Sequence, residues 1–271
     1  VATAPGLLVV HDPSSARTSV FDSAGSFLRR WNSACCNWKG IGVTREGVIA
    51  VPFNGNPAGA RHAGDAYFVR YLLDGSLVDT LRIVGPEGVG EPRRWSFESA
   101  NGNQYFVPIP LTPAVSMTLN PAGGAIVGWS GAYRFFTTRT GLDTTQVVTL
   151  ETGPVTVTEA QRIHLRDSLV EWYGDGEVDR KATDEAFKLA DIPSTAPYFE
   201  SIAVDGSGNC WVRRVGGTSQ ISARFDVFDS TGAYLGAVPV GAFDDEAVAR
   251  VVGLPRGERP LYILPVGALA P

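Results

Sequence analysis

The sequence FDSTGAYLGAV (residues 228–238) repeats, with few changes, an earlier stretch, FDSAGSFLRRW (residues 21–31). In each copy alternating apolar and polar residues lead into Asp-Ser-x-Gly, and a second alternation leads out of it. This pattern predicts a β-hairpin, because glycine supplies the positive φ of a tight turn and aspartate hydrogen-bonds its own turn. Looser copies are VRYLLDGSLVDTLRI (69–83) and YRFFTTRTGLDTTQVVTL (133–150).

Each hairpin follows a glycine-led apolar strand, such as EGVIAVPF (46–53), GGAIVGWS (123–130) or DGSGNCWVRR (205–214). Four short antiparallel strands per repeat are typical of a propeller blade. We therefore predict an all-β fold in which residues 1–271 form a single β-propeller domain of five or six blades, in a complete or incomplete ring. Blades are expected at residues 4–33, 38–85, 104–152, 197–240 and, more weakly patterned, 248–267.

One segment departs from the β pattern. Residues 155–193 read as helical, so we expect a helical insertion near 156–192 between two blades. Thr156 and Glu159 match a capping box, and the Gly-Asp-Gly at 174–176 ends the first helix. A shorter helix is expected at 183–190. The stretch 85–104 is expected to be a long loop, in which RRWSF is either loop or an extra strand.

Three motifs in order carry a resemblance to a known family: GAYRFFTTRTGLDTTQVVTL, GPVTVTEAQ, and VDGSGNCWVRR followed by FDVFDSTGAYLGAVPV. The chain resembles bacterial six-bladed, NHL-like β-propeller proteins of the periplasm and cell surface. The similarity covers residues 123–240 closely and 6–83 loosely. It implies the propeller fold and a periplasmic or extracellular location, together with a secretion signal or lipid anchor and further blades before the first residue. Most members of that group are uncharacterised.

Composition narrows the range of partners. The chain has 271 residues, 44% of them hydrophobic, and a net charge of −5. Lys and Arg never cluster beyond a pair, which argues against a nucleic-acid or anionic-lipid surface. No apolar run approaches the ~20 residues that a membrane helix needs. The chain starts at Val1, which fits either a processed product or a piece of a longer chain.

The three cysteines allow two interpretations. A Cys35–Cys210 or Cys36–Cys210 disulfide forms if the ends of the fold meet, whereas adjacent cysteines rarely bond each other. The alternative is that two or all three of them are buried and act as small hydrophobic side chains. No spacing of Cys and His matches a metal site.

Catalytic motifs are scarce, and we predict no catalytic residue, no metal site and no cofactor. His11 beside Asp12 at a strand end is either a ligand or general base near a central channel, or a strand cap. Asp205 opens D-x-S-x-N, which resembles the start of a calcium loop. The glutamate expected at its twelfth position is missing, so a β-turn is the better interpretation.

An exposed tryptophan beside arginine is typical of interface anchors. Trp38 in CCNWKG and Trp95 in RRWSF lie in loop-like contexts. The partner-contact candidates are therefore Trp38, Arg93, Arg94, Trp95 and Trp172.

The function hypothesis that fits best is a non-catalytic scaffold or interaction propeller. It would lie on the periplasmic or outer side, as an accessory subunit that stabilises a membrane-bound complex such as a respiratory or photosynthetic one. Its partners would be other protein subunits, with the membrane reached only through a partner or an anchor before Val1. Two alternatives stay open: a propeller that binds a small molecule or sugar, and a metal-dependent, lactonase-like hydrolase.

Overall fold

The computed structural model describes residues 2–4, 6–34, 41–53, 65–86, 89, 93–174, 177–215 and 224–239. Four sheets of four antiparallel strands, each in sequential order, make up most of this part. The first sheet comprises β1 (Ala2–Ala4), β2 (Leu7–Asp12), β3 (Arg17–Asp22) and β4 (Phe27–Asn32). The second comprises β5 (Gly42–Val43), β6 (Ile49–Phe53), β7 (Ala66–Tyr71) and β8 (Leu77–Ile83).

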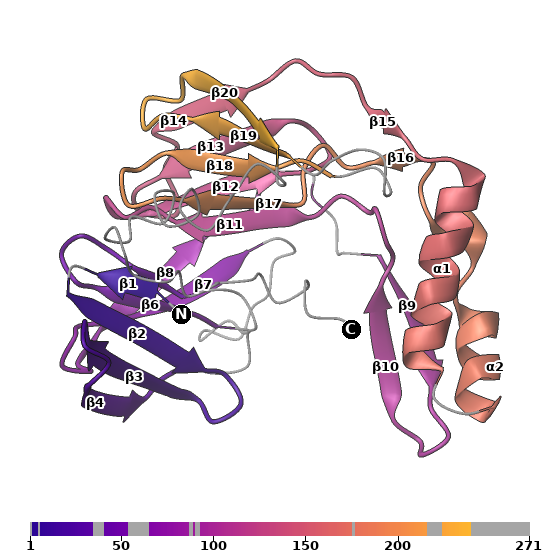
Figure 1. Cartoon of the computed structure of the whole chain (residues 1–271), viewed down its shortest axis with the longest axis horizontal. Helices are drawn as coiled ribbons and strands as arrows, with labels where there is room; N and C mark the ends of the chain where they lie inside the picture. Colours follow the sequence, from indigo (N-terminus) through magenta and orange to yellow (C-terminus); the bar gives the residue numbers. More distant parts are fainter. Residues whose placement is uncertain are drawn as a thin grey trace.

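The third and fourth sheets follow the same plan further along the chain. The third comprises β11 (Val115–Leu119), β12 (Ala125–Trp129), β13 (Arg134–Thr138) and β14 (Gln146–Thr149). The fourth comprises β17 (Ser201–Val204), β18 (Cys210–Arg213), β19 (Arg224–Phe228) and β20 (Tyr234–Pro239). Their first strands touch in the order β1, β5, β11, β17, so the sheets follow one another around an arc (Figure 1).

The second strands of the second and third sheets, β6 and β12, are buried on both of their faces, which explains why they are apolar. In β6, Ile49 and Val51 pack with the first sheet, whereas Ala50 packs toward the third. In β12, Val127 packs toward the second sheet and Ile126 toward the fourth. Sheets that stack face to face around a central axis, with their first strands nearest to it, are the blades of a propeller. The described fold is a β-propeller.

The repeated Gly phrase forms one and the same turn in seven described hairpins. Asp22 N–H donates to Ser26 O and Gly25 N–H donates to Asp22 O, both at 3.0 Å. Each glycine has φ between +80° and +96°, as a type I turn with a glycine bulge requires. The seven turn glycines are Gly25, Gly47, Gly75, Gly102, Gly123, Gly208 and Gly232.

The outer turn of a blade packs on the outer strand of the blade before it. Gly75, between β7 and β8, lies against the ring of Trp31 in β4. Gly232, between β19 and β20, lies against Val148 of β14, and Gln146 donates to Thr231 O. Gly141 of the third blade accepts a hydrogen bond from Val84 N–H, 3.0 Å, after β8. These contacts fix the outer edges of neighbouring blades relative to one another.

Two segments between blades form structure of their own, outside the four-stranded sheets. The first, between β8 and β11, is the hairpin of β9 (Arg94–Glu98) and β10 (Gln104–Pro108). The second, between β14 and β17, contains the pair β15 (Val155–Thr156) and β16 (Thr195–Ala196). Between these two strands lie α1 (Glu159–Tyr173), α2 (Glu177–Ala186) and the 3-10 turn η1 (Leu189–Asp191). Figure 1 shows the hairpin and the helices together, to one side of the four blades.

The helical insertion is confirmed, with shifted boundaries. Thr158, rather than Thr156, caps α1: its hydroxyl accepts from Gln161 N–H, and the Gln161 side chain accepts from Thr158 N–H. Thr156 is unavailable because it pairs with Thr195 in the β15–β16 ladder. Gly174 ends α1 as expected. The second helix starts earlier than predicted, at Glu177, and the predicted stretch 183–190 ends in the 3-10 turn.

The predicted blade at 104–152 is corrected. Residues 104–108 form β10, which pairs with β9 instead of joining the third blade. The described residues hold four blades, where the resemblance implied six; the expected weaker blade at 248–267 lies outside the described residues.

Because the strands of a blade alternate in direction, its connections alternate between the two faces of the propeller. Six of the seven short glycine turns lie on one face, here called the turn face. The seventh is the turn of the β9–β10 hairpin. The β2–β3 and β12–β13 connections lie on the opposite face, here called the insertion face, and the strands that flank the two insertions (β8, β11, β14 and β17) end or begin on it. Both insertions therefore leave from the same face.

Candidate functional site

The two insertions, far apart in sequence, pack into one body, here called the insertion unit (β9, β10, α1, α2 and η1). Trp95 stacks on Phe187 with ring centroids 4.7 Å apart and an interplanar angle of 17°. Phe97 meets Phe187 edge to face, at 5.8 Å. The buried core of the unit is Trp95, Phe97, Val107, Ile109, Val170, Phe187 and Ile192. This core is separate from the clusters between the blades.

Polar contacts also join the two insertions. The Trp95 indole N–H donates to Asp191 Oδ2, 2.9 Å, in η1. Arg93 donates to the other oxygen of the same carboxylate, at 3.2 Å. At the far end of the hairpin, Ala100 N–H donates to Asp179 Oδ1 of α2, 2.6 Å. An isolated two-stranded hairpin is marginal in water, so these contacts hold β9–β10 in place.

Two arginines of α1 tie the helices together. Arg166 Nε donates to the carbonyl of Phe187, 2.8 Å, and its NH2 group donates to the Asp184 side chain. Arg162 NH1 donates to the carbonyl of Ile192, 3.3 Å. Carbonyls at the ends of α2 and η1 are thereby satisfied, as helix ends require. Both guanidinium groups face the interior of the unit.

A buried ion pair lies between the third and fourth blades, close to the point where the helical insertion begins. Asp226 is 1% exposed and accepts from Tyr133 OH at 2.8 Å and from Arg214 NH1 at 3.3 Å. Arg214 also donates to Thr152 Oγ1, 3.2 Å, just after β14. Tyr234 OH donates to the second Asp226 oxygen at 3.3 Å. This network fastens the start of the insertion to the fourth blade.

Burial, and after it the hydrogen bond to Asp226, raises the pKa of Tyr133 well above its ordinary value. The phenol therefore stays protonated and acts as a donor. Because the network satisfies its own charges and is almost closed to solvent, we assign it a structural role.

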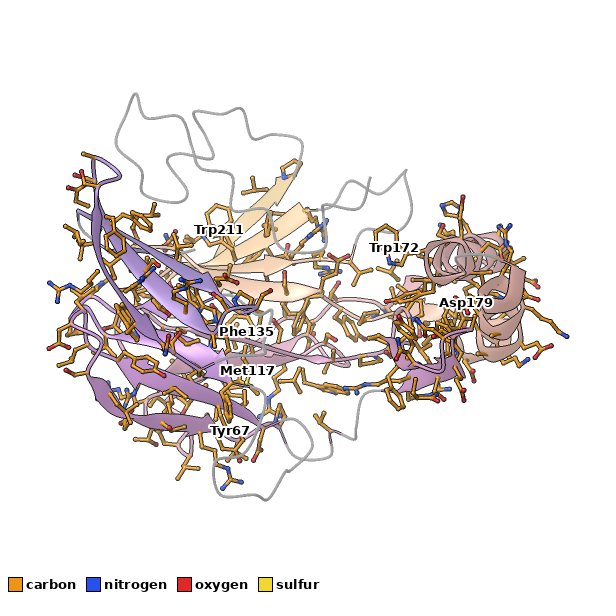
Figure 2. The ribbon with its side chains drawn as sticks, turned by 90° about the horizontal axis from the view of Figure 1, so that it is seen from below. Tyr67, Met117, Phe135, Trp172, Asp179 and Trp211 are labelled. Atoms are coloured by element: carbon orange, nitrogen blue, oxygen red, sulfur yellow. The ribbon has the colours of Figure 1, made fainter. Side chains whose placement is uncertain are left out.

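Two aromatic side chains of the insertion unit are largely exposed. Phe106 of β10 is 63% exposed and lies opposite Ser96, on the face of the hairpin that does not carry Trp95. Trp172 of α1 is 60% exposed. Figure 2 shows Trp172 and Asp179 on the helices, apart from Tyr67, Met117, Phe135 and Trp211 in the blades. Exposed large aromatic side chains on a built-up unit are typical of contact surfaces.

Some of the predicted contact residues are exposed in the structure and others are not. Arg93 and Arg94 are exposed on or beside β9, and Trp172 is exposed on α1. Trp95 as a surface anchor is wrong: it is 4% exposed, because alternation along β9 turns it toward Phe187 and the helices. Trp38 lies outside the described residues. Phe106 was not predicted, although QYFVP alternates beside the Asn101-Gly102 turn signal, because that strand was assigned to a blade.

A disulfide at Cys210 is also wrong. Cys210 is a free, buried thiol in the core between the third and fourth blades, where it packs as a small apolar side chain. Burial raises the pKa of Cys210 to about 12, which keeps the thiol protonated and unreactive. Cys35 and Cys36 lie outside the described residues.

His11 pairs with hydroxyls rather than carboxylates. Its Nδ1 lies 3.2 Å from Thr18 Oγ1 and 3.3 Å from Ser33 Oγ, and these two oxygens are 2.8 Å apart. Burial lowers the pKa of His11, which favours the neutral ring. Asp12 does not orient it; its carboxylate accepts from Ser14 N–H and Ser15 N–H in the following turn. This supports the strand-end interpretation.

Asp205 is confirmed as a turn residue. Its oxygens accept from Ser207 N–H, Asn209 N–H, the Asn209 amide and the Trp211 indole, at 2.8 to 3.0 Å. Within the described ranges, no group of three or more His, Cys, Asp and Glu could hold a metal ion. None of the helices in the part of the chain that the structure describes is long and apolar enough to cross a membrane.

Comparison with known proteins gives structural likeness only. No protein-family model matches the sequence, and no curated protein matches it. A member of the DUF4221 family from Bacteroides vulgatus aligns with a TM-score of 0.40 and 9% identity, over 86% of this chain and 64% of that one. A protein of unknown function from Bacteroides caccae aligns with a TM-score of 0.36 and 9% identity, over 88% and 80%.

A third solved structure is the β-propeller domain of Cps50 (Swd1) from Myceliophteria thermophila, with a TM-score of 0.30, 8% identity and 86% of each chain covered. Alignments at these scores identify neither a family nor an activity. Function is therefore inferred from the geometry of this chain alone.

Proposed function

We propose that this protein is a non-catalytic interaction propeller, and that the insertion unit is the surface that holds a protein partner. The observation that carries the proposal is the separate core of the unit, centred on Trp95 and Phe187. Residues from two distant insertions build this core, and it adds nothing to the packing between blades. A rigid scaffold that presents such a unit on one face is a common way to position a binding surface.

The exposed side chains of the unit support the proposal. Phe106 and Trp172 present aromatic surface to solvent, and Arg94 is exposed beside Phe106 on the same face of the hairpin. Aromatic residues and arginine are the side chains that most often dominate the binding energy of interfaces. Because the buried core fixes the backbone that carries them, little ordering entropy is lost on binding.

The test is co-purification of a tagged chain from its native host. We expect the double variant Phe106→Ala and Trp172→Ala to lose its partner. The matched control is Phe27→Ala with Leu77→Ala, two residues 56% and 65% exposed at the outer edges of the first and second blades. The control should keep the partner. If both variants bind as the parent chain does, the insertion unit is not the contact surface.

The finer part of the proposal concerns location. We propose that the partner belongs to a membrane-bound assembly reached from the periplasmic or outer side, with this chain as an accessory subunit. The support is the resemblance in sequence to periplasmic and cell-surface propellers. Fractionation of native cells tests it: the chain should sediment with membranes and be released together with its partner by mild detergent. A chain found entirely in the cytosolic fraction would contradict it.

A further inference from the structure

Helix α1 turns one side to solvent over its whole length of 15 residues. The exposed residues of α1, here called the outward face, are Glu159, Ala160, Ile163, His164, Asp167, Ser168, Glu171 and Trp172. They recur every three or four positions, so they line one side of the helix. The opposite side carries Val170 into the core of the insertion unit.

The outward face is acidic because the basic residues of α1 lie on its other side. Arg162 and Arg166, the two arginines of α1, point inward and bond the carbonyls of Ile192 and Phe187. Arg166 also pairs with Asp167 at 2.9 Å, but it shares that charge with Asp184 of α2. Glu171 has no Lys or Arg at the positions three or four residues away in sequence, where a helical ion pair would form.

The C-terminal end of α1 carries the exposed aromatic residue of this face. The last turn of the helix contains no basic residue of its own, and Arg180 of α2 packs against its C-cap, Gly174. Trp172 lies in that last turn, next to Glu171, and its indole is 60% exposed. An exposed indole beside negative charge suits a cation placed over the ring.

We propose that the outward face of α1 binds a basic segment of a partner protein, with a lysine or arginine of the partner over Trp172 and close to Glu171. This inference rests on the proposed function and names the chemistry of its partner. Charge complementarity selects a polypeptide: the same acidic face repels the phosphates of nucleic acids and anionic lipids.

The experiment uses site-specific photo-cross-linking in the native host, with the probe amino acid p-benzoyl-phenylalanine. It replaces one of three exposed serines in otherwise unchanged chains: Ser168 on the outward face, Ser96 on the hairpin beside Phe106, and Ser207 on the turn face. Mass spectrometry identifies the cross-linked partner segment. Each capture is repeated with Glu171→Lys and Asp167→Lys added, and at low and high salt.

The expected result is capture from Ser168 of a segment with net positive charge, and no capture from Ser207. Charge reversal at Glu171 and Asp167 should lower this capture by about fivefold, the loss of roughly one exposed ion pair, and high salt should lower it as well. Capture from Ser96 alone, or capture of an acidic segment from Ser168, would overturn this inference while leaving the proposed function standing. If neither Ser168 nor Ser96 captures a protein, both fail.

Discussion

The indole N–H of Trp95 donates to the carboxylate of Asp191 at 2.9 Å, although 96 positions separate the two residues. One belongs to the hairpin between the second and third blades, and the other to the helical insertion between the third and fourth. This hydrogen bond and the stacking of Trp95 on Phe187 join the two insertions into one packed unit. The insertion unit should therefore open and close as a local unit of stability.

The first prediction concerns that bond. Trp95→Phe keeps an aromatic ring against Phe187 but removes the donor to Asp191 and part of the volume of the indole, and should cost about 1–3 kcal/mol. Trp95→Ala also empties the stack on Phe187 and should cost about 3–5 kcal/mol.

Amide hydrogen exchange should show faster exchange in β9, α1 and α2, while the blades keep their protection. Arg94→Ala, an exposed neighbour on the same strand, is the control and should leave exchange unchanged. Uniformly faster exchange across the blades would contradict a separate unit.

The second prediction concerns the buried ion pair. Asp226→Ala leaves Arg214 buried without its counter-charge, and should lower the free energy of unfolding by about 3–5 kcal/mol. Tyr133→Phe removes one donor to Asp226 and should cost about 1 kcal/mol. In urea titrations, adding Arg214→Met to Asp226→Ala should recover part of the loss. Strictly additive losses would mean that the two charges do not interact.

The third prediction compares two glycines of the same repeated phrase. Gly25 and Gly232 have φ of +81° and +80°, so alanine meets the same backbone penalty of about 1 kcal/mol at both. At Gly25 a Cβ would meet nothing within 4 Å, whereas at Gly232 it would lie 2.8 Å from Val148 of the preceding blade.

Gly232→Ala should therefore cost about 1–2 kcal/mol more than Gly25→Ala in urea titrations. Gly153→Ala, at a position with open space and no positive φ, serves as the control. Equal losses at Gly25 and Gly232 would show that the outer turns do not pack on the preceding blade.

The fourth prediction concerns Cys210. In a chain carrying Cys35→Ser and Cys36→Ser, a thiol reagent at pH 8 should react with the protein only after urea unfolds it, because the thiol is buried and protonated. Since burial raises the pKa from 9.0 to about 12, the native state keeps a proton that the unfolded state releases in that range.

This contribution to stability is complete below pH 9 and is lost as the pH rises toward 12. The loss should be smaller in the Cys210→Ala variant, which titrates no thiol at that position. Rapid modification of the native chain at pH 8 would show that the thiol is accessible.

The repeated phrase was enough to predict the blades, because its turn chemistry is local: Asp22 and Gly25 make their hydrogen bonds within five residues. The pairing of β10 could not be predicted from the sequence, because a strand that pairs with β9 carries the same alternation as one that pairs within a blade. Similarly, both Thr156 and Thr158 match a capping box, and only the pairing of Thr156 with Thr195 decides between them.

The candidate site was harder to predict than the fold. The alternation in RWSFE places Trp95 and Phe97 on one face of a strand, which already signals burial once the stretch is taken as a strand. The helices that cover that face come from the other insertion, so their contact depends on tertiary structure. The acidity of the outward face likewise follows from where Arg162 and Arg166 point, and their positions in the sequence do not show this.

The most direct test of the interaction surface is hydrogen exchange on the complex isolated through a tagged chain, compared with the chain alone. We predict that binding slows amide exchange in β9, β10 and α1, around Phe106 and Trp172, and leaves the turns at 72–76 and 229–233 unchanged. Slower exchange confined to those turns, with the insertion unit exchanging as in the free chain, would contradict the proposal that this unit is where the propeller meets its partner.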